Sequence, residues 1–229
     1  MMHRFEQRAY LQAADAEREE MMTRMMHRFE QSAALAQRFD CIVRRATAQD
    51  TGTSEHSCRV ASYSVLIARR LGLTETECSE LRQTALLHDI GKAVVPQSIL
   101  TKPGKLTPRE YAIMQTHVTL GADILKNFAL AGRIVEGAQF HQEHWDGKGY
   151  VSGLAGEDIP LFARIICVAD AFDAMTQDRV YRKRLKLDFA LWEIERCSGT
   201  QFDPTLARVL LDLVSEGTIK PIYMRHDRI

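Results

Sequence analysis

The residues in this chain that are best suited to chemistry are histidines and aspartates placed beside apolar stretches. An imidazole or a carboxylate that faces a protein core is costly to bury unless it has a partner. Any one of them, such as His56 about three turns before Ile67, could be an ordinary packed core residue, and a His-Asp dipeptide alone is weak. Six such positions in one chain argue instead for a shared partner: His56, His88, Asp89, His117, His141 and Asp170.

The partner that these residue types favour is a metal ion. Imidazole nitrogens and carboxylate oxygens bind Fe, Mn or Zn, and one carboxylate can bridge two ions. Two ions about 3.5–4 Å apart hold a hydroxide at neutral pH and stabilise the charge on an attacked phosphate. Lys92 adds an ammonium next to the His-Asp pair, and the glycine-rich loop 144–160 would let the backbone approach a phosphate or a base.

Short helices with clear start signals must position these residues. Thr74 and Glu77 form a capping box at the start of the helix that ends at His88–Gly91. Thr107–Glu110 combines a capping box with proline at the first helical position, and Asp203–Pro204 repeats the cap-then-proline device. No alternating strand pattern of useful length occurs, so the sequence predicts an all-α fold.

Composition limits the class of protein. The chain has 229 residues, 45% of them hydrophobic, which suffices for one sizeable core. Thirty basic residues balance thirty acidic ones, so the net charge favours neither a nucleic acid polymer nor an anionic membrane as partner. Five cysteines without a Cys-x-x-Cys pair fit a reducing compartment, and no leader or spanning segment is recognisable. We therefore expect a cytoplasmic protein.

The first part of the chain predicts a helical extension over residues 1–48, followed by one domain over residues 49–229. The extension lacks Gly and Pro, and the string MMHRFEQ occurs at Met1–Gln7 and again at Met25–Gln31. Its apolar side chains fall roughly on one stripe, so the helix either docks on the core or also forms a homodimer. A local duplication explains the repeated string as well as a function does.

Longer motifs occur in order across about Cys41 to Leu213. They are DTGTSEH (50–56), LHDIGKA (87–93), LTKPGKLT (100–107), MQTH (114–117), HQEHWDGKGY (141–150), VADAFDAMTQDRVYRK (168–183) and GTQFDP (199–204). In residues and spacing they resemble the HD-GYP family of bacterial cyclic di-GMP phosphodiesterases. The resemblance implies an all-helical HD-domain bundle, a bi- or trinuclear iron or manganese site, and a loop that helps to form the substrate pocket.

The resemblance also implies a role for each matching residue. One metal would be held by His56, His88, Asp89 and Asp170. Asp89 would bridge to a second ion held by His117 and His141, with Gln142 beside them. Asp50 would orient ligands from outside their shell.

Further matching residues would handle the substrate. Lys92 would contact the scissile phosphate and act with Asp89 in catalysis. Tyr150, with Gly147 and Gly149, would lie in the loop over the nucleotide. Arg179 and Arg182 match phosphate-holding positions, although the same arginines could form a solvated basic turn.

Three departures from the family pattern fall at or beside this site. Gln142 stands where the fuller pattern has a second histidine, and an amide is the weaker ligand. Gly52 stands where trinuclear members have a glutamate, so we expect two ions at most. Val151 replaces the proline that would stiffen the loop.

These observations lead to three hypotheses of function. The first is a phosphodiesterase that hydrolyses cyclic di-GMP to linear pGpG, or on to GMP, with a metal-bound hydroxide as nucleophile. The second is a catalytically weak signalling module that binds the nucleotide or a partner protein, which Gln142 and Val151 favour. The third is an HD phosphohydrolase with another cyclic dinucleotide or nucleotide as substrate.

Overall fold

The computed structural model describes residues 53–128, 130, 132–178 and 183–220. The chain divides into two units, Met1–Ile42 and Val43–Ile229, and every described residue belongs to the second. The expected N-terminal helix, its repeated string and its role in a dimer therefore lie outside the described residues. So do Asp50, Gly52, Arg179 and Arg182. The boundary at residues 48 and 49 stays a prediction.

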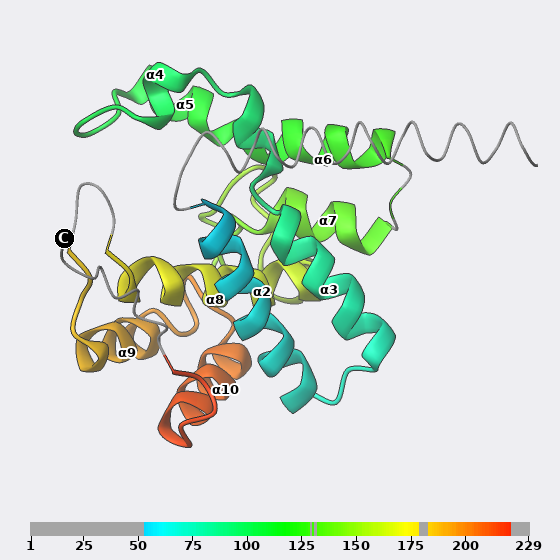
Figure 1. Ribbon diagram of the computed structural model, residues 1–229, viewed down its shortest axis with the longest axis vertical. Helices are drawn as coiled ribbons and strands as arrows, with labels where there is room; N and C mark the ends of the chain where they lie inside the picture. The colour runs from blue at the N-terminus through cyan, green and yellow to red at the C-terminus, as the bar shows by residue number, and fades with distance from the viewer. Residues whose placement is uncertain (1–52, 129, 131, 179–182, 221–229) are drawn as a thin grey trace, which may run out of the picture. The chain divides into compact units, whose positions relative to one another are not determined.

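The described residues form α-helices and short 3-10 segments, with no strand among them (Figure 1). In chain order these elements are α2 (Thr53–Arg70), α3 (Glu75–Leu87), η1 (Ile90–Val94), α4 (Gln97–Leu100), α5 (Pro108–Gln115), α6 (His117–Asn127), α7 (Gly132–Phe140), η2 (Gly156–Asp158), α8 (Leu161–Thr176), α9 (Leu187–Arg196) and α10 (Pro204–Ser215). The all-α prediction is confirmed.

The helices begin where the capping residues of the sequence predict. Thr74 and Glu77 form a reciprocal capping box before α3, and Thr107 and Glu110 do the same before α5. The side chain of Asp203 accepts hydrogen bonds from the first backbone N–H groups of α10. Because these caps occupy the orphan donors of each first turn, they set where each helix starts.

Helix α8 is the centre of the core. Ile165, Ile166 and Phe172 are fully buried in it, and the helix packs against α2, α7, α9 and α10 (Figure 1). A helix that is apolar on nearly all sides is buried on all sides. Its two carboxylates, those of Asp170 and Asp173, therefore face the interior of the domain, Asp170 partly and Asp173 fully buried.

A close backbone contact joins η1 to α6. A Cβ atom added to Gly91 would lie 1.9 Å from the carbonyl oxygen of His117 and 2.6 Å from the nitrogen of Gly121. Only a glycine permits this approach. It brings Asp89, just before η1, next to His117 at the start of α6.

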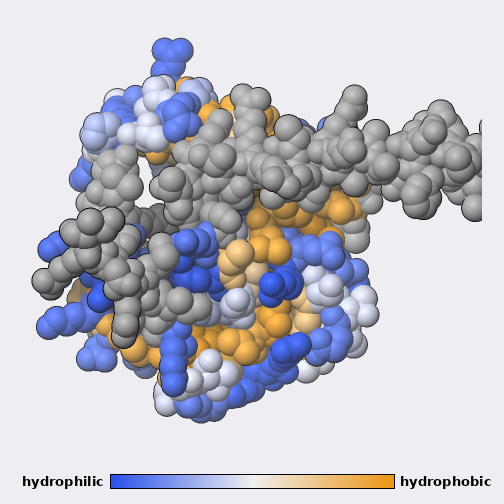
Figure 2. Space-filling model, viewed as in Figure 1, coloured by the Kyte–Doolittle hydropathy of each residue, from blue (hydrophilic) through white to orange (hydrophobic). Residues whose placement is uncertain are grey.

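The surface of the described residues mixes polar and apolar side chains. Figure 2 shows hydrophilic residues along the rim of the described surface on one face and hydrophobic residues nearer its middle. Tyr111, Phe189 and Trp192 are about half exposed. None of the described helices has both the length and the apolar character needed to cross a bilayer.

Candidate metal centre

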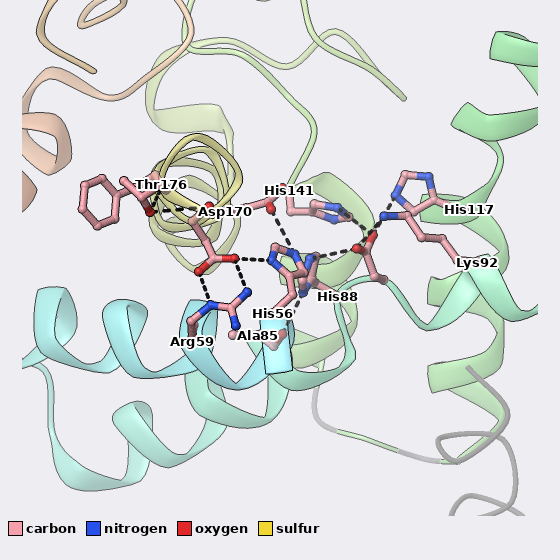
Figure 3. Close-up of polar contacts among 12 residues, drawn as sticks. His56, Arg59, Ala85, His88, Lys92, His117, His141, Asp170 and Thr176 are labelled. Carbon is pink, nitrogen blue, oxygen red and sulfur yellow. Dashed lines mark hydrogen bonds and ion pairs between the residues drawn. The ribbon is translucent and has the colours of Figure 1, made fainter. Parts of the chain in front are cut away.

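Histidines and aspartates from separate helices converge on one point in the domain (Figure 3). One group of potential ligand atoms comes from His56, His88 and Asp170, and all of these atoms lie within 4.8 Å of one another. A second group, of the same size, comes from His88, Asp89 and His141. His88 belongs to both groups, so the two candidate ion sites adjoin.

Three of the histidines are oriented by the backbone of the preceding helical turn. In each, the ring Nδ1 lies within hydrogen-bond distance of a carbonyl oxygen three residues earlier, to which it can only donate. The pairs are His88 with Ala85 at 2.7 Å, His117 with Met114 at 2.8 Å and His141 with Ala138 at 2.8 Å. This bond places the proton on Nδ1 and leaves an acceptor lone pair on Nε2 of the neutral ring.

The three Nε2 atoms point at the carboxylate of Asp89. They lie 3.3 Å (His88), 3.4 Å (His117) and 3.8 Å (His141) from its oxygens. These nitrogens and Oδ1 of Asp89 are buried without a hydrogen-bond partner among the described residues. Lone pairs that face a carboxylate with no donor between them are unfavourable in a buried site. Metal ions bound here would accept these lone pairs, so the residues present fit the predicted group.

The electrostatics of the same site favour the ligand forms of its residues. Burial alone would raise the pKa of Asp89, but Lys92, with Nζ 2.6 Å from Oδ2, and His88 hold that pKa well below its usual range. Burial lowers the pKa of His117 and, helped by His88, lowers the pKa of His141 to about 3. An anionic carboxylate and neutral imidazoles are the forms that bind metals.

His56 is held in a different way. Its Nε2 lies 3.2 Å from Oδ1 of Asp170, and its Nδ1 lies 2.7 Å from Oδ2 of Asp173. Burial would lower the pKa of His56, but the two carboxylates outweigh burial and raise it to about 9. The partner that the sequence demands for the partly buried Asp170 is thus His56, and an ion bound at Nε2 would take the place of a proton.

The glycine-rich loop returns to the centre through its backbone. The N–H of Tyr150 donates to the carbonyl of Gln142 at 3.1 Å, and a Cβ atom on Gly149 would lie 2.5 Å from that oxygen. The ring of Tyr150 lies 6.4 Å from the rings of both His117 and Tyr111. Gln142 is partly buried directly after His141. Tyr150 is therefore next to the candidate ligands, and its role over a bound nucleotide stays a prediction.

A buried carboxylate that was not predicted as part of the site, that of Glu143, lies directly before this loop. Its exposed fraction is 2%, and Oε1 accepts the N–H groups of Ser152 at 2.6 Å and Gly153 at 3.1 Å. Gly153 itself has a φ of +69°, which favours glycine. Glu143 thus joins the later part of the loop, at Ser152 and Gly153, to the segment that directly follows His141 and Gln142. The sequence signal for Glu143 was an acidic residue between the predicted ligand His141 and the glycine-rich loop.

Asp173 and Arg59 were also missed as parts of the site. Asp173 lies one helical turn after Asp170 and is 1% exposed, so it shares the face of α8 that meets His56. The signal in the sequence was a second carboxylate in an apolar helix, which needs a partner for the same reason as the first.

A cavity of about 500 Å³ lies elsewhere in the domain. It is lined by residues of α8, α9 and the segment after α9, among them Met175, Arg196 and Phe202. None of the predicted site residues lines it. This cavity is therefore separate from the histidine cluster.

The fold and this histidine-aspartate cluster define an HD domain. The family model described as "HD domain" matches residues 42–206, so the chain belongs to that family. Its resemblance to the HD-GYP branch is confirmed by relatives named as cyclic di-GMP phosphodiesterases.

Two of these relatives are about 40% identical to the chain. The cyclic di-GMP phosphodiesterase of Thermotoga maritima is 41% identical over 179 residues, which cover 77% of this chain and 48% of that protein. The response regulator RpfG of Xanthomonas campestris, also named a cyclic di-GMP phosphodiesterase, is 40% identical over 74% of this chain and 46% of its own length. The chain thus spans about half the length of these relatives.

A solved structure supports the same fold. The crystal structure of a cyclic GMP-AMP specific phosphodiesterase from Vibrio cholerae aligns with a TM-score of 0.61 at 28% identity, covering 78% of this chain and 49% of that one. The HD domain of PgpH from L. monocytogenes, in complex with cyclic-di-AMP, aligns with a TM-score of 0.54 at 18% identity, covering 82% of this chain and 98% of that one, and shows the fold alone.

Proposed function

We propose that this chain is a metal-dependent phosphodiesterase that hydrolyses cyclic di-GMP to linear pGpG. The observation that carries the proposal is the set of three buried Nε2 atoms that face the carboxylate of Asp89 with no hydrogen-bond partner among the described residues. This arrangement fits a cation, and the relatives bear names of cyclic dinucleotide phosphodiesterases.

The ligands would be divided between two ions, Fe or Mn. His56, His88 and Asp170 would hold one, and Asp89 would bridge to the other. His117 and His141 would hold the second, with the side chain of Gln142 beside them. Such ions, when bound, supply a nucleophile at neutral pH and neutralise charge on an attacked phosphate.

Side chains around the ions would bind and orient the substrate. The ammonium of Lys92 lies 2.6 Å from Asp89 and is 37% exposed, so it can meet a phosphate at the edge of the centre. Tyr150 would lie against the nucleotide, and Gly147 and Gly149 would keep the loop backbone open to it. Arg179 and Arg182, outside the described residues, would act with Lys92 as phosphate clamps.

Product analysis tests this function. Chromatography of time courses with added Mn or Fe should show slow hydrolysis of cyclic di-GMP, with the linear dinucleotide accumulating before GMP. The rate should be low because Gln142 weakens the second site and Val151 leaves the loop less rigid. Asp89→Ala is the blank. Rapid conversion to GMP would contradict the expectation that Gln142 and Val151 slow the reaction.

Metal content tests the centre itself. Protein purified without chelator should carry Fe or Mn by elemental analysis. His88→Ala and Asp89→Ala should lose metal and activity together while the circular dichroism spectrum remains helical. Full metal content in either variant would contradict the ligand assignment.

The same experiments test two alternative functions. Relatives named as 3'3'-cGAMP-specific phosphodiesterases favour a second substrate, so 3'3'-cGAMP should be assayed alongside cyclic di-GMP. Tight nucleotide binding without turnover of either would instead support a signalling module, for which Gln142 is the favouring residue.

A further inference from the structure

His56 differs from the other predicted ligand histidines in what holds its second nitrogen. His88, His117 and His141 each use a backbone carbonyl in their own chain segment. His56 instead uses the carboxylate of Asp173, which is 117 residues away in the chain. The orientation of its ring therefore depends on a side chain from another helix.

Arg59 holds that carboxylate in place. Its Nε donates to Oδ1 of Asp173 at 2.6 Å, and its Nη2 donates to Oδ2 at 3.0 Å. The same Oδ2 lies 2.7 Å from Nδ1 of His56. Two parallel hydrogen bonds from a guanidinium fix both the position and the plane of a carboxylate. Figure 3 shows Arg59 and His56 reaching from α2 toward α8.

Two helices thus contribute alternately to one row of polar groups. Arg59 and His56 lie one turn apart on α2, while Asp173 and Asp170 lie one turn apart on α8. The order through space is Arg59, Asp173, His56 and Asp170, and contacts of 2.6, 2.7 and 3.2 Å join neighbours in the row. The row ends at the candidate ion site.

We propose that Arg59 and Asp173 are positioning residues that orient His56 and thereby set the affinity of the ion site formed by His56, His88 and Asp170. This inference rests on the metal centre of the proposed function. Neither residue would touch substrate or metal. Hydrogen-bonded carboxylates behind a ligand histidine fix its ring orientation and commonly change metal affinity or activity by roughly ten- to a hundredfold when removed.

Burial makes the arginine necessary for this role. The side chains of Arg59 and Asp173 are 11% and 1% exposed. A buried ion pair of this kind is weak evidence that it is present for the stability of the fold. Among the described residues, Asp173 without Arg59 would keep only His56 as a side-chain partner and could turn in its site. Loss of the guanidinium should therefore loosen the imidazole, because the bond described at its Nδ1 goes to Asp173.

Arg59→Met is the first variant to test, because methionine keeps much of the apolar stem and removes the guanidinium. Metal-free protein is titrated with Mn²⁺, and free Mn²⁺ is followed by its electron paramagnetic resonance signal. The expected result is about ten- to a hundredfold weaker binding of one Mn²⁺ ion. Asp173→Asn should weaken the same ion, since the amide NH2 would replace one accepting oxygen with a donor.

Arg164→Met is the matched control. Arg164 also forms a buried arginine-aspartate pair, with Nη1 2.7 Å from Oδ2 of Asp203 and side-chain exposures of 15% and 6%. It lies on α8 but contacts none of the predicted ligands. A general loss of stability would affect both variants, so thermal unfolding is measured for each. Only Arg59→Met should lose Mn²⁺ affinity.

Arg59→Lys provides a graded test, since lysine keeps the charge but cannot form both parallel bonds. Its Mn²⁺ affinity should lie between that of the wild type and that of Arg59→Met. Wild-type affinity in Arg59→Met, or an equal loss in Arg164→Met, would overturn the positioning role. Absence of Mn²⁺ binding in the wild type would instead refute the metal centre. Binding without hydrolysis of cyclic di-GMP would refute the proposed reaction alone.

Discussion

At the scale of single residues, the charge of His56 is set by the two carboxylates that flank it. Asp170 and Asp173 raise the pKa of its imidazole to about 9, against an ordinary value near 6.5. Metal-free protein should therefore carry a proton on His56 at neutral pH. This proton links the stability of the metal-free fold to pH.

The free energy of unfolding of metal-free protein should fall as the pH rises above about 6.5. A group whose pKa is higher in the folded state stabilises fully below its unfolded pKa, and His56 loses this contribution as the pH rises through about 9. Denaturant titrations with chelator present, at several pH values, measure the slope. His56→Asn should show a flatter profile. The difference between the two profiles removes the effect of the partly buried Cys167 thiol, whose pKa burial raises to about 12.

Gln142→His should tighten the second ion site. The substitution places an imidazole directly after His141, where the family pattern expects one. Ligand changes at metal sites alter affinity by roughly ten- to a hundredfold, so Mn²⁺ titration and rate measurements would detect the gain. Gln97→His, at an exposed position of α4, is the control. An unchanged or lower affinity would mean that Gln142 suits another geometry.

At the scale of elements, the helix starts were predictable because their signals are local. The capping boxes at Thr74 and Thr107 involve residues three apart, and both occur as expected. The exit of α3 at His88–Gly91 was predictable for the same reason. The contact between Asp173 and His56 joins residues 117 apart, and no local pattern encodes which carboxylate of α8 faces which nitrogen.

Gly91→Ala should separate the elements that assemble the centre. Its Cβ would lie 1.9 Å from the carbonyl oxygen of His117, so η1 or α6 must move. Asp89 would then part from His117, and both stability and Mn²⁺ affinity should fall. Gly132→Ala is the control, because a Cβ there meets nothing within 4 Å. Thermal unfolding and Mn²⁺ titration compare them, and unchanged metal affinity in Gly91→Ala would contradict this role of the glycine contact.

At the scale of the whole molecule, the metal centre should be independent of the N-terminal extension. None of the predicted ligands lies in residues 1–37, so a chain without them should keep its Mn²⁺ affinity and change only its association state. Light scattering on both forms, with a metal titration, checks this. An insoluble truncated protein would mean that the segment belongs to the core and would contradict dimerisation as its role.

The overall class was predictable because capped helices and motifs in register extend across most of the chain. The loop was predictable only in part. Gly147 and Gly149 marked where it turns, but the fastening of Gly153 by Glu143 depends on how the loop folds back onto its own start. Such contacts follow from the assembled domain and have no periodicity to reveal them.

The carbonyl bonds at three of the histidines have a consequence for how this protein tolerates mutation. Ala85, Met114 and Ala138 hold the rings through backbone oxygens, which every amino acid possesses. Substituting those residues does not remove the backbone acceptor, so most point mutations there leave the hydrogen bond that orients the ring. The ring of His56 is instead oriented by the side chains of Asp173 and Arg59, which a single substitution can remove. A saturation library selected for metal retention should therefore be permissive at the partly exposed Met114 and intolerant at Arg59 and Asp173. At Ala85 and Ala138, both 0% exposed, it should reject large side chains because they overpack the core.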